Sequence, residues 1–368
     1  MRILLITALS DLPEAHLICG LARSGLDVDL VADETAIYHD LWLQAGLKPT
    51  LMRFRNKFDR VVIGRLRSLL RQGRYDAFHA FSNRPLTNAM VASAGFTMGR
   101  IGYCGTTDHL HLLDPACRLT FLSSRMDRIV CVSDAVRRYM RSRAVPEQRL
   151  RVIYKGHDPS WYRAAPRAAL ATLGMRVDAF AIACVANLRP VKGGHVLLQA
   201  LRRLPASSPV QVLLIGEMRD PSLLQAVEHD PVLRARVCVA GFRDDATSLL
   251  GACDATVMPS LHSEGLPKAV LESMCLGVPP IVSNAGGLPE VVESGRHGWV
   301  TPSGDAGALA EAMQAAAADR DSSTALGQAA RARVMELFHI SKTTEQTLNL
   351  YRELMEQRGR GKGWRQPS

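Results

Sequence analysis

Short apolar runs rich in β-branched residues alternate along this chain with segments of helix length, and the alternation occurs in two blocks. Such alternation is typical of parallel sheets covered by helices on both faces. In the first block we expect strands at residues 3–7, 28–31, 77–80, 100–103, 128–132 and 151–154. In the second block we expect them at residues 181–185, 211–215, 236–240, 255–258 and 280–283. The pattern predicts an α/β fold of two Rossmann-like, doubly wound domains.

The alternation is interrupted at residues 155–178, where glycine, proline and alanine accumulate. We therefore expect a first domain over residues 1–160 and a second over 161–340. A helix over residues 341–357 should brace the first domain, and residues 358–368 should form a flexible tail. Ligands bind beyond the carboxyl ends of parallel strands, so we expect a ligand in a cleft between the two domains.

The net charge of +10 is unevenly distributed. Residues 1–160 carry 23 lysines and arginines against 15 aspartates and glutamates, and the remainder carries 22 against 20, so anionic partners should meet the first domain. No apolar run approaches the roughly 18 residues that span a bilayer. The eight cysteines include no CxxC pair, which favours buried thiols in a reducing cytoplasm. Because no standard metal-ligand spacing occurs, we expect no metal cofactor.

Two glutamates lie eight positions apart in the stretch SEGLPKAVLE. Pro267 suits the first turn of a helix, which places Glu264 just before that helix and Glu272 within it. The carboxylates then lie on the order of 10 Å apart along the axis, too far to share a proton. The N–H groups of a helix start attract a diphosphate. A nucleotide sugar, with hydroxyl groups on both sides of a diphosphate, fits this pattern, although an ordinary loop and helix also produce it.

A second motif, VANLRPVKGGHVLLQAL, turns from a strand into a helix at the start of the second domain. Asn187, Arg189 and Lys192 lie in this turn, before a helix expected from about Gly193. Two cations and glycines at such a turn form a plausible diphosphate clamp. The alternative interpretation is an ordinary exposed basic loop.

Together, the segments NLRPVKGG, GFRDDATSLLGACDATVMPS, SEGLPKAVLESMCLGVPPIVSNAGGLPEVVESGRHGWV and RVIYKGHD resemble retaining glycosyltransferases of family 4, which have the GT-B fold. The resemblance covers most of residues 130–355, and in the first domain it is best in DRIVCVSDAVRRYM. It implies a cytoplasmic, metal-independent enzyme that moves a sugar, with retention, from a nucleotide-diphosphate donor to a glycan or lipid-linked acceptor. Cell-surface polysaccharide or lipopolysaccharide assembly is the process it implies.

The resemblance also implies roles for individual residues. Arg189 and Lys192 would neutralise the donor diphosphate, Glu272 would hold the ribose hydroxyls, and Glu264 would lie near the donor sugar. His109 is the candidate for a histidine near the anomeric carbon, with Asp108 and His111 as competitors. The other expected donor contacts are Asn187, Gly216, Phe242, Arg243, Gly265, Leu266 and Pro267, with Phe242 and Arg243 beside the nucleobase.

The chain departs from the family pattern at three places. The loop after the first expected strand, residues 10–14, has two acids and no glycine. Met218 replaces the second glycine of a G-x-G motif, and Lys155 replaces an asparagine. Two alternatives therefore stay open: a nucleotide-sugar epimerase of the same fold, and a catalytically idle binding or scaffold protein.

An arginine-rich stretch, residues 53–74, sets apolar residues on one side of an expected helix. The simpler interpretation is a domain helix with a solvated basic face. In the alternative, Phe54, Phe58 and the arginines rest on an anionic membrane surface and bring the site to a lipid-linked acceptor. We expect no nucleic-acid partner, because this stretch belongs to no recognised binding fold.

Overall fold

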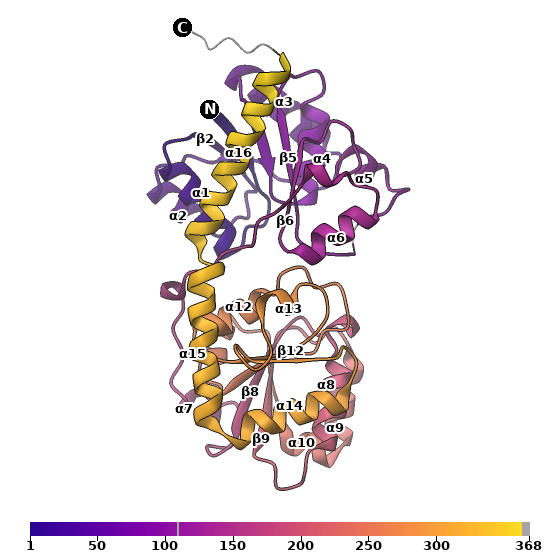
Figure 1. The fold of residues 1–368 in the computed structure, drawn as a ribbon, viewed down its shortest axis with the longest axis vertical. Helices are drawn as coiled ribbons and strands as arrows, with labels where there is room; N and C mark the ends of the chain where they lie inside the picture. The colour runs from indigo at the N-terminus through magenta and orange to yellow at the C-terminus, as the bar shows by residue number, and fades with distance from the viewer. Residues whose placement is uncertain (109, 363–368) are drawn as a thin grey trace. The chain divides into compact units, whose positions relative to one another are not determined.

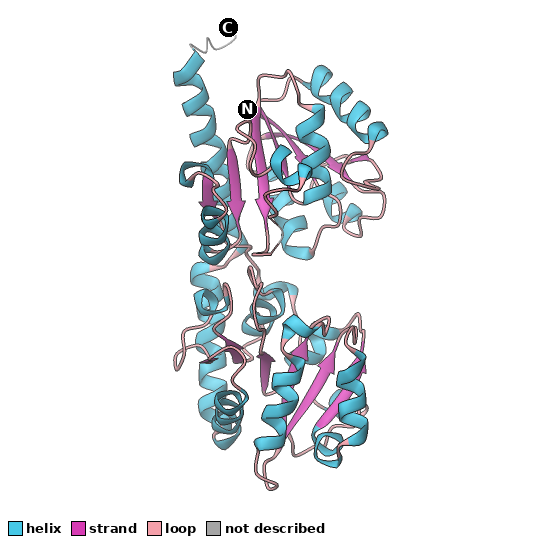
Figure 2. Cartoon of the chain, turned by 90° about the vertical axis from the view of Figure 1, so that its right-hand side faces the viewer, coloured by secondary structure: helices cyan, strands magenta, loops and turns pink. Residues whose placement is uncertain are grey.

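The structure is a computed structural model that describes residues 1–108 and 110–362. It divides into two compact units: Met1–Gly156 together with the chain from Ile340 onward, and His157–His339. The expected domain boundaries, at residues 160 and 340, lie close to these divisions. Both units are α/β layers around a parallel sheet (Figure 2), so the predicted fold class is confirmed.

The first unit contains a seven-stranded parallel sheet in the order β3-β2-β1-β4-β5-β6-β7. Its strands are β1 (Arg2–Ile6), β2 (Asp27–Ala32), β3 (Thr50–Leu51), β4 (Ala77–Ala80), β5 (Gly99–Cys104), β6 (Arg128–Cys131) and β7 (Leu150–Val152). Its α-helices are α1 (Leu12–Arg23), α2 (His39–Gln44), α3 (Arg60–Gly73), α4 (Asn83–Ala92), α5 (Pro115–Leu119), α6 (Asp134–Ser142) and α16 (Ile340–Lys362).

The second unit contains a six-stranded parallel sheet in the order β10-β9-β8-β11-β12-β13. Its strands are β8 (Phe180–Val185), β9 (Val210–Ile215), β10 (Val237–Gly241), β11 (Ala255–Met258), β12 (Pro280–Ser283) and β13 (Trp299–Thr301). Its α-helices are α7 (Ala168–Ala171), α8 (Gly194–Arg203), α9 (Pro221–His229), α10 (Pro231–Arg236), α11 (Ala246–Gly251), α12 (Lys268–Cys275), α13 (Leu288–Val291), α14 (Ala306–Ala318) and α15 (Arg320–Leu337).

Alternation along the central strands produces a core on each face of a sheet. In β8, Phe180 and Ile182 pack with α8, α9 and α14, whereas Ala181 and Ala183 pack with α7 and α11. All four are buried, because successive side chains of a strand point to opposite faces. This double burial explains why the strands appear in the sequence as continuous apolar runs.

Helix α16 packs along α1 within the first unit (Figure 1). Tyr351 is fully buried, and its hydroxyl group lies 2.7 Å from Nδ1 of His79 on β4. The helix continues past residue 357, and Arg358 donates to Asp127 at 3.0 Å. The helix therefore extends to Lys362, five residues beyond the predicted end at residue 357. Residues 363–368 of the predicted tail lie outside the described residues.

Two strands were missed in the sequence. β3 and β13 have two and three residues and lie at the edges of their sheets, where no long apolar run is needed. All eight cysteines are free thiols, and seven of them are buried. Among the described helices, none combines the length and apolar character that crossing a bilayer requires.

Candidate functional site

The candidate site lies at one edge of the second unit's sheet. Because the strands are parallel, the loops after β8, β9, β10 and β11 all emerge at this edge. The strand order reverses at β8, which has β9 on one side and β11 on the other, and such a switch point leaves a crevice that binds ligands. The residues expected in this unit from both motifs lie in these loops or in α12.

The loop between β11 and α12 is tightly held. Ser263 has a φ of +65°, in the left-handed region. Gly286 packs so close that a side chain there would overlap the carbonyl oxygen of Glu264, and the N–H of Gly287 donates to the same oxygen at 3.1 Å. The N–H groups of Gly265 and Leu266 donate to no acceptor among residues 1–108 and 110–362. The loop therefore presents two backbone donors beside the start of α12, an arrangement that suits an anion.

Lys192 and Glu264, which belong to different motifs, are directly bonded. The ammonium nitrogen of Lys192 lies 2.6 Å from Oε1 of Glu264, and the hydroxyl group of Ser260 donates to the same oxygen at 2.6 Å. Both charged side chains are largely buried. The sequence predicted separate contacts with the ligand for them, but it did not predict that they pair. Glu264 thus fixes the position of the Lys192 ammonium group.

Backbone contacts hold the two loops at this distance. The N–H of Leu261 donates to the carbonyl oxygen of Val191 at 2.8 Å. Gly193 has a φ of +72°, and a side chain there would overlap the carbonyl oxygen of Pro259. Gly193 therefore allows the two loops to approach closely. Lys192 and Glu264 can pair because the backbones of their loops are in contact.

Glu272 is buried on α12 and has its own cation. Nζ of Lys268, one helical turn earlier, lies 3.4 Å from Oε1 of Glu272. The helix begins at Lys268, one residue later than predicted, and Pro267 is its N-cap residue. The two glutamates are thus paired with different lysines, which agrees with the prediction that they do not form an acid–base dyad.

Arg189 and Asn187 lie on the exposed side of the loop after β8. The N–H of Arg189 donates to the carbonyl oxygen of Asn187 at 2.6 Å, which makes the turn compact. The Arg189 guanidinium forms no ion pair with any residue within 1–108 and 110–362. Arg189 therefore offers an exposed positive charge close in the chain to the buried Lys192–Glu264 pair.

Four residues expected at the donor line one pocket of about 340 Å³, a volume at the lower end of the range for small-molecule sites. They are Asn187, Gly216, Phe242 and Arg243. Gly216 has a φ of +133°, and a side chain there would overlap the carbonyl oxygen of Ala186. The Phe242 ring is 73% exposed. The pocket is therefore lined by the accessible ring of Phe242, and Gly216 allows its wall to pack closely against Ala186.

Sequence reasoning missed part of this pocket. Glu217 and Arg219 also line it, and they pair with each other at 2.6 Å. Arg243 forms two hydrogen bonds with Asp245, at 2.7 and 2.9 Å, which hold its guanidinium in place. Glu217 and Arg219 lie on either side of Met218, shortly after the buried strand β9. This position after a strand was the signal in the sequence that could have identified them as pocket residues.

Two family models match the chain, one over most of the first unit and the other over most of the second. The model described as "Glycosyltransferase Family 4" matches residues 15–161, and the model described as "Glycosyl transferases group 1" matches residues 171–333. The chain belongs to glycosyltransferase family 4. The resemblance inferred from the motifs is thereby confirmed.

Two relatives match this family-4 chain over different lengths. The putative colanic acid biosynthesis glycosyltransferase WcaL of Salmonella typhimurium is 28% identical over 62% of this chain and 57% of its own. The chain thus spans little more than half of that relative. The lipopolysaccharide core biosynthesis glycosyltransferase LpsE of Rhizobium meliloti is 26% identical over 91% of this chain and 93% of its own.

The fold also matches a solved structure. The crystal structure of Anabaena HepE in complex with UDP-glucose has a TM-score of 0.77 at 20% identity, and the match covers 95% of this chain and 99% of HepE. At this identity the likeness establishes the fold, which is GT-B.

In the first unit, two departures from the family-4 pattern are bonded to each other. Nζ of Lys155 lies 2.7 Å from Oδ2 of Asp11, and Asp11 also caps α1 by accepting from the N–H of Glu14. Glu14 is buried and accepts hydrogen bonds from Thr7 and Ser10. Burial raises the pKa of Glu14 to about 7 although the Lys155 charge opposes the rise. The Lys155–Asp11 ion pair and the helix cap thus hold the loop at residues 10–14, which contains no glycine.

The remaining predictions concern His109, metal and the basic stretch. His109 lies outside the described residues, so its role stays a prediction. Within the described residues, no three His, Cys, Asp or Glu side chains gather as metal ligands do. In the basic stretch, Phe54 is only 3% exposed whereas Phe58 is 48% exposed. In the alternative of a membrane contact, the part assigned to Phe54 is therefore wrong, because this side chain is buried.

Proposed function

We propose that this family-4 chain transfers a sugar from a nucleotide-diphosphate sugar to a glycan or lipid-linked acceptor, with retention, during cell-surface polysaccharide or lipopolysaccharide assembly. The observation that carries the proposal is the switch-point crevice, where the Lys192–Glu264 pair lies beside the backbone donors before α12. The donor complex of HepE and the descriptions of WcaL and LpsE support the choice of donor and process.

The donor would extend along the edge of the sheet. The nucleobase would enter the pocket that Phe242 and Arg243 line, and Glu272 would accept hydrogen bonds from the ribose hydroxyls. The diphosphate would meet Arg189, Lys192 and the N–H groups of Gly265 and Leu266. Each part of the donor would then contact a group of matching chemistry.

Transfer requires stabilisation of the leaving group. As the bond between the sugar and the diphosphate breaks, negative charge grows on the departing phosphate oxygen. A fixed ammonium group, a guanidinium and helix-start N–H groups stabilise that charge without having to reorganise. For retention, the acceptor hydroxyl would attack from the face that the diphosphate leaves and give its proton to a departing phosphate oxygen.

A donor screen followed by turnover tests the proposal. Thermal shift with UDP-, GDP- and ADP-sugars should reveal one that raises the melting temperature, since a ligand of the native state stabilises it. Release of the nucleoside diphosphate should then require an added acceptor, and it should fall on Glu272→Ala or Lys192→Ala. Glu345→Ala, which removes an exposed carboxylate of α16, is the control and should change neither. Full turnover by both site variants would overturn the site assignment.

The same experiment separates the two alternatives. An epimerase would convert the sugar nucleotide without any acceptor, and an idle protein would bind the donor without consuming it. Proton NMR of the product reports whether the anomeric configuration is retained. Undiminished transfer in excess EDTA would support metal-independent chemistry, and complete loss would contradict it.

The acceptor side of the proposal includes an anionic membrane surface on the cytoplasmic side, met by residues 53–74. Val61 is 71% exposed and Phe58, three positions earlier in the chain, is 48% exposed, and arginines continue along α3. Exposed apolar residues next to arginines suit an anionic bilayer. Vesicles containing phosphatidylglycerol should sediment the protein, and Phe58→Ser with Val61→Ser should reduce this. Equal sedimentation with neutral vesicles would contradict it.

A further inference from the structure

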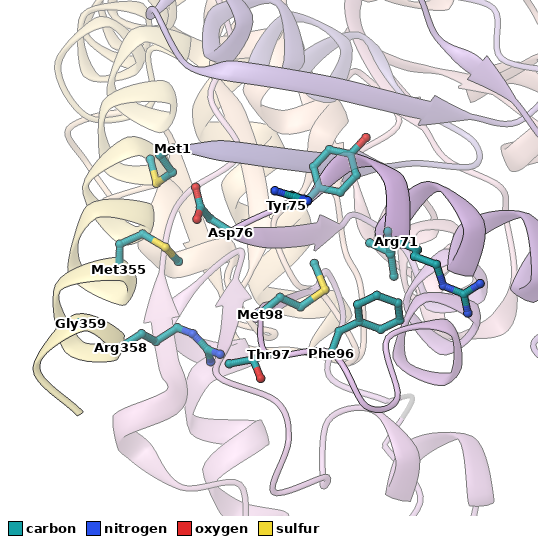
Figure 3. Close-up of a pocket in the computed structure, with 12 residues that line it drawn as sticks. Met1, Arg71, Tyr75, Asp76, Phe96, Thr97, Met98, Met355, Arg358 and Gly359 are labelled. Carbon is teal, nitrogen blue, oxygen red and sulfur yellow. The ribbon is translucent and has the colours of Figure 1, made fainter. Parts of the chain in front are cut away.

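A second pocket lies in the first unit, away from the edge at which its parallel strands end (Figure 3). Its volume is about 640 Å³, well within the range of small-molecule sites. Its residues come from the amino ends of three neighbouring strands and from two helices. They include Met1 before β1, Tyr75 and Asp76 before β4, Phe96 to Met98 before β5, the end of α3, and Met355, Arg358 and Gly359 of α16.

The position of this pocket separates it from the loops at the opposite edge of the sheet. Strands of four to six residues lie between the two edges, a separation of roughly 13–20 Å. A ligand held at the amino ends therefore cannot touch groups that follow the carboxyl ends. The pocket is a candidate for an effector rather than for the donor or acceptor.

The walls of the pocket are apolar and adaptable. Leu70, Tyr75 and Met98 line it and are buried. The methionine side chains of Met1, Met98 and Met355 lie around the open space, with the Phe96 ring next to Met98 (Figure 3). Methionine is flexible and polarisable, so such walls adjust to an alkyl chain.

The charges around the pocket are mostly positive. Its lining includes Arg71, Arg74 and Arg358 against one carboxylate, that of Asp76. Asp76 already accepts the backbone N–H of Arg2 at 2.8 Å, and Arg358 pairs with Asp127. Arg71 and Arg74 form no ion pair with any residue in the described ranges. These two arginines leave positive charge at the end of α3 without a partner.

We propose that this pocket binds a single-chain anionic amphiphile, such as an alkyl phosphate or a fatty acid. The anionic head would meet Arg71 and Arg74, which form charge-assisted hydrogen bonds with phosphate or carboxylate oxygens. The alkyl chain would run between Phe96 and Met98 toward Met355 on α16. Because α16 forms one wall, the bound ligand would also hold the last turns of this helix against the first unit.

The test is calorimetric titration of the full chain with dodecyl phosphate below its micelle concentration. We expect saturable binding that inorganic phosphate and dodecanol, each used alone, do not reproduce, because the pocket needs both head and chain. Arg71→Gln with Arg74→Gln should weaken binding roughly tenfold or more. Arg60→Gln with Arg65→Gln removes equal charge from α3 outside the pocket and should change binding less than twofold.

A second measurement locates the ligand. Amide hydrogen exchange in the last turns of α16 should slow when dodecyl phosphate is bound, and Met355→Gln should remove much of this effect. Three results would overturn the proposal: absence of binding to the unaltered chain, equal weakening by both arginine pairs, or equal affinity for inorganic phosphate. Equal weakening would mean that the ligand binds to the basic surface of α3 in general and not in the pocket.

Discussion

Lys192 and Glu264, which are 72 positions apart in the chain, form an ion pair in which Nζ lies 2.6 Å from Oε1. The pair joins the loop after β8 to the loop after β11 at the point where the strand order reverses. One contact therefore connects the two motifs that the sequence marked separately. It serves both to hold the loops together and to position a cation.

The two roles of this pair can be separated by mutation. Lys192→Met leaves the buried Glu264 carboxylate with the Ser260 hydroxyl group as its hydrogen-bond donor. We expect the free energy of unfolding to fall by roughly 3 kcal/mol. Adding Glu264→Gln should recover much of that stability, because the uncompensated charge is gone, whereas transfer activity should stay lost. Urea unfolding and turnover measure the two effects. A double variant as unstable as Lys192→Met would show that the charge of Glu264 is not the cause.

The two glutamates should affect different steps. Glu272→Ala should weaken the binding of a free nucleoside diphosphate by about 10- to 100-fold, since hydrogen bonds to a charged group contribute about 1.5–3 kcal/mol. Glu264→Gln should leave this affinity within about threefold and lower the turnover of the bound donor instead. Calorimetry with the nucleoside diphosphate and single-turnover kinetics measure the two effects. Equal loss of affinity in both variants would contradict the division of roles.

Gly216 should tolerate no side chain. Gly216→Ala places a methyl group against the carbonyl oxygen of Ala186 at a φ of +133°, so the loop must move. We expect a loss of about 1–3 kcal/mol in unfolding free energy and impaired donor binding. Gly64→Ala is the matched control: its site on α3 is open, and alanine there should stabilise by up to about 1 kcal/mol. If both variants behave alike, backbone strain at Gly216 is not the cause.

Glu14 should make stability depend on pH. Its folded pKa of about 7 exceeds the ordinary value of 4.5, so between these values the folded state holds a proton that the unfolded chain releases. The free energy of unfolding should therefore fall as pH rises through this window, by on the order of 3 kcal/mol, and stay lower above it.

The comparison variant for this effect is Glu14→Gln, which cannot ionise. Relative to the unaltered chain, the free energy of unfolding of Glu14→Gln should increase from pH 5 to pH 8, because only the unaltered chain loses stability over this range. Burial also lowers the pKa of His79 to about 3, so its contribution to stability is lost as pH falls below 6.5. Comparison of the two proteins separates the effect of Glu14 from that of His79, because both proteins contain His79. A difference that does not change with pH would contradict the raised pKa.

Local sequence patterns were sufficient for most of the fold. Strand β8 is buried on both faces, so it appears as an apolar run of its own length. The start of α12 after Pro267 was also predictable to within one residue, because proline suits a helix start. The edge strands β3 and β13 were not, since pairing with a neighbour defines them more than composition does.

The sequence by itself determined two parallel α/β units and the loops that carry Lys192, Glu264 and Glu272. Only the tertiary structure decided which charges meet: Lys192 with Glu264, and Lys155 with Asp11, 144 positions away. The physical reason is that an ion pair depends on the distance between two atoms, and strand order sets that distance for residues far apart in the chain. Neither motif spacing nor composition contains that order.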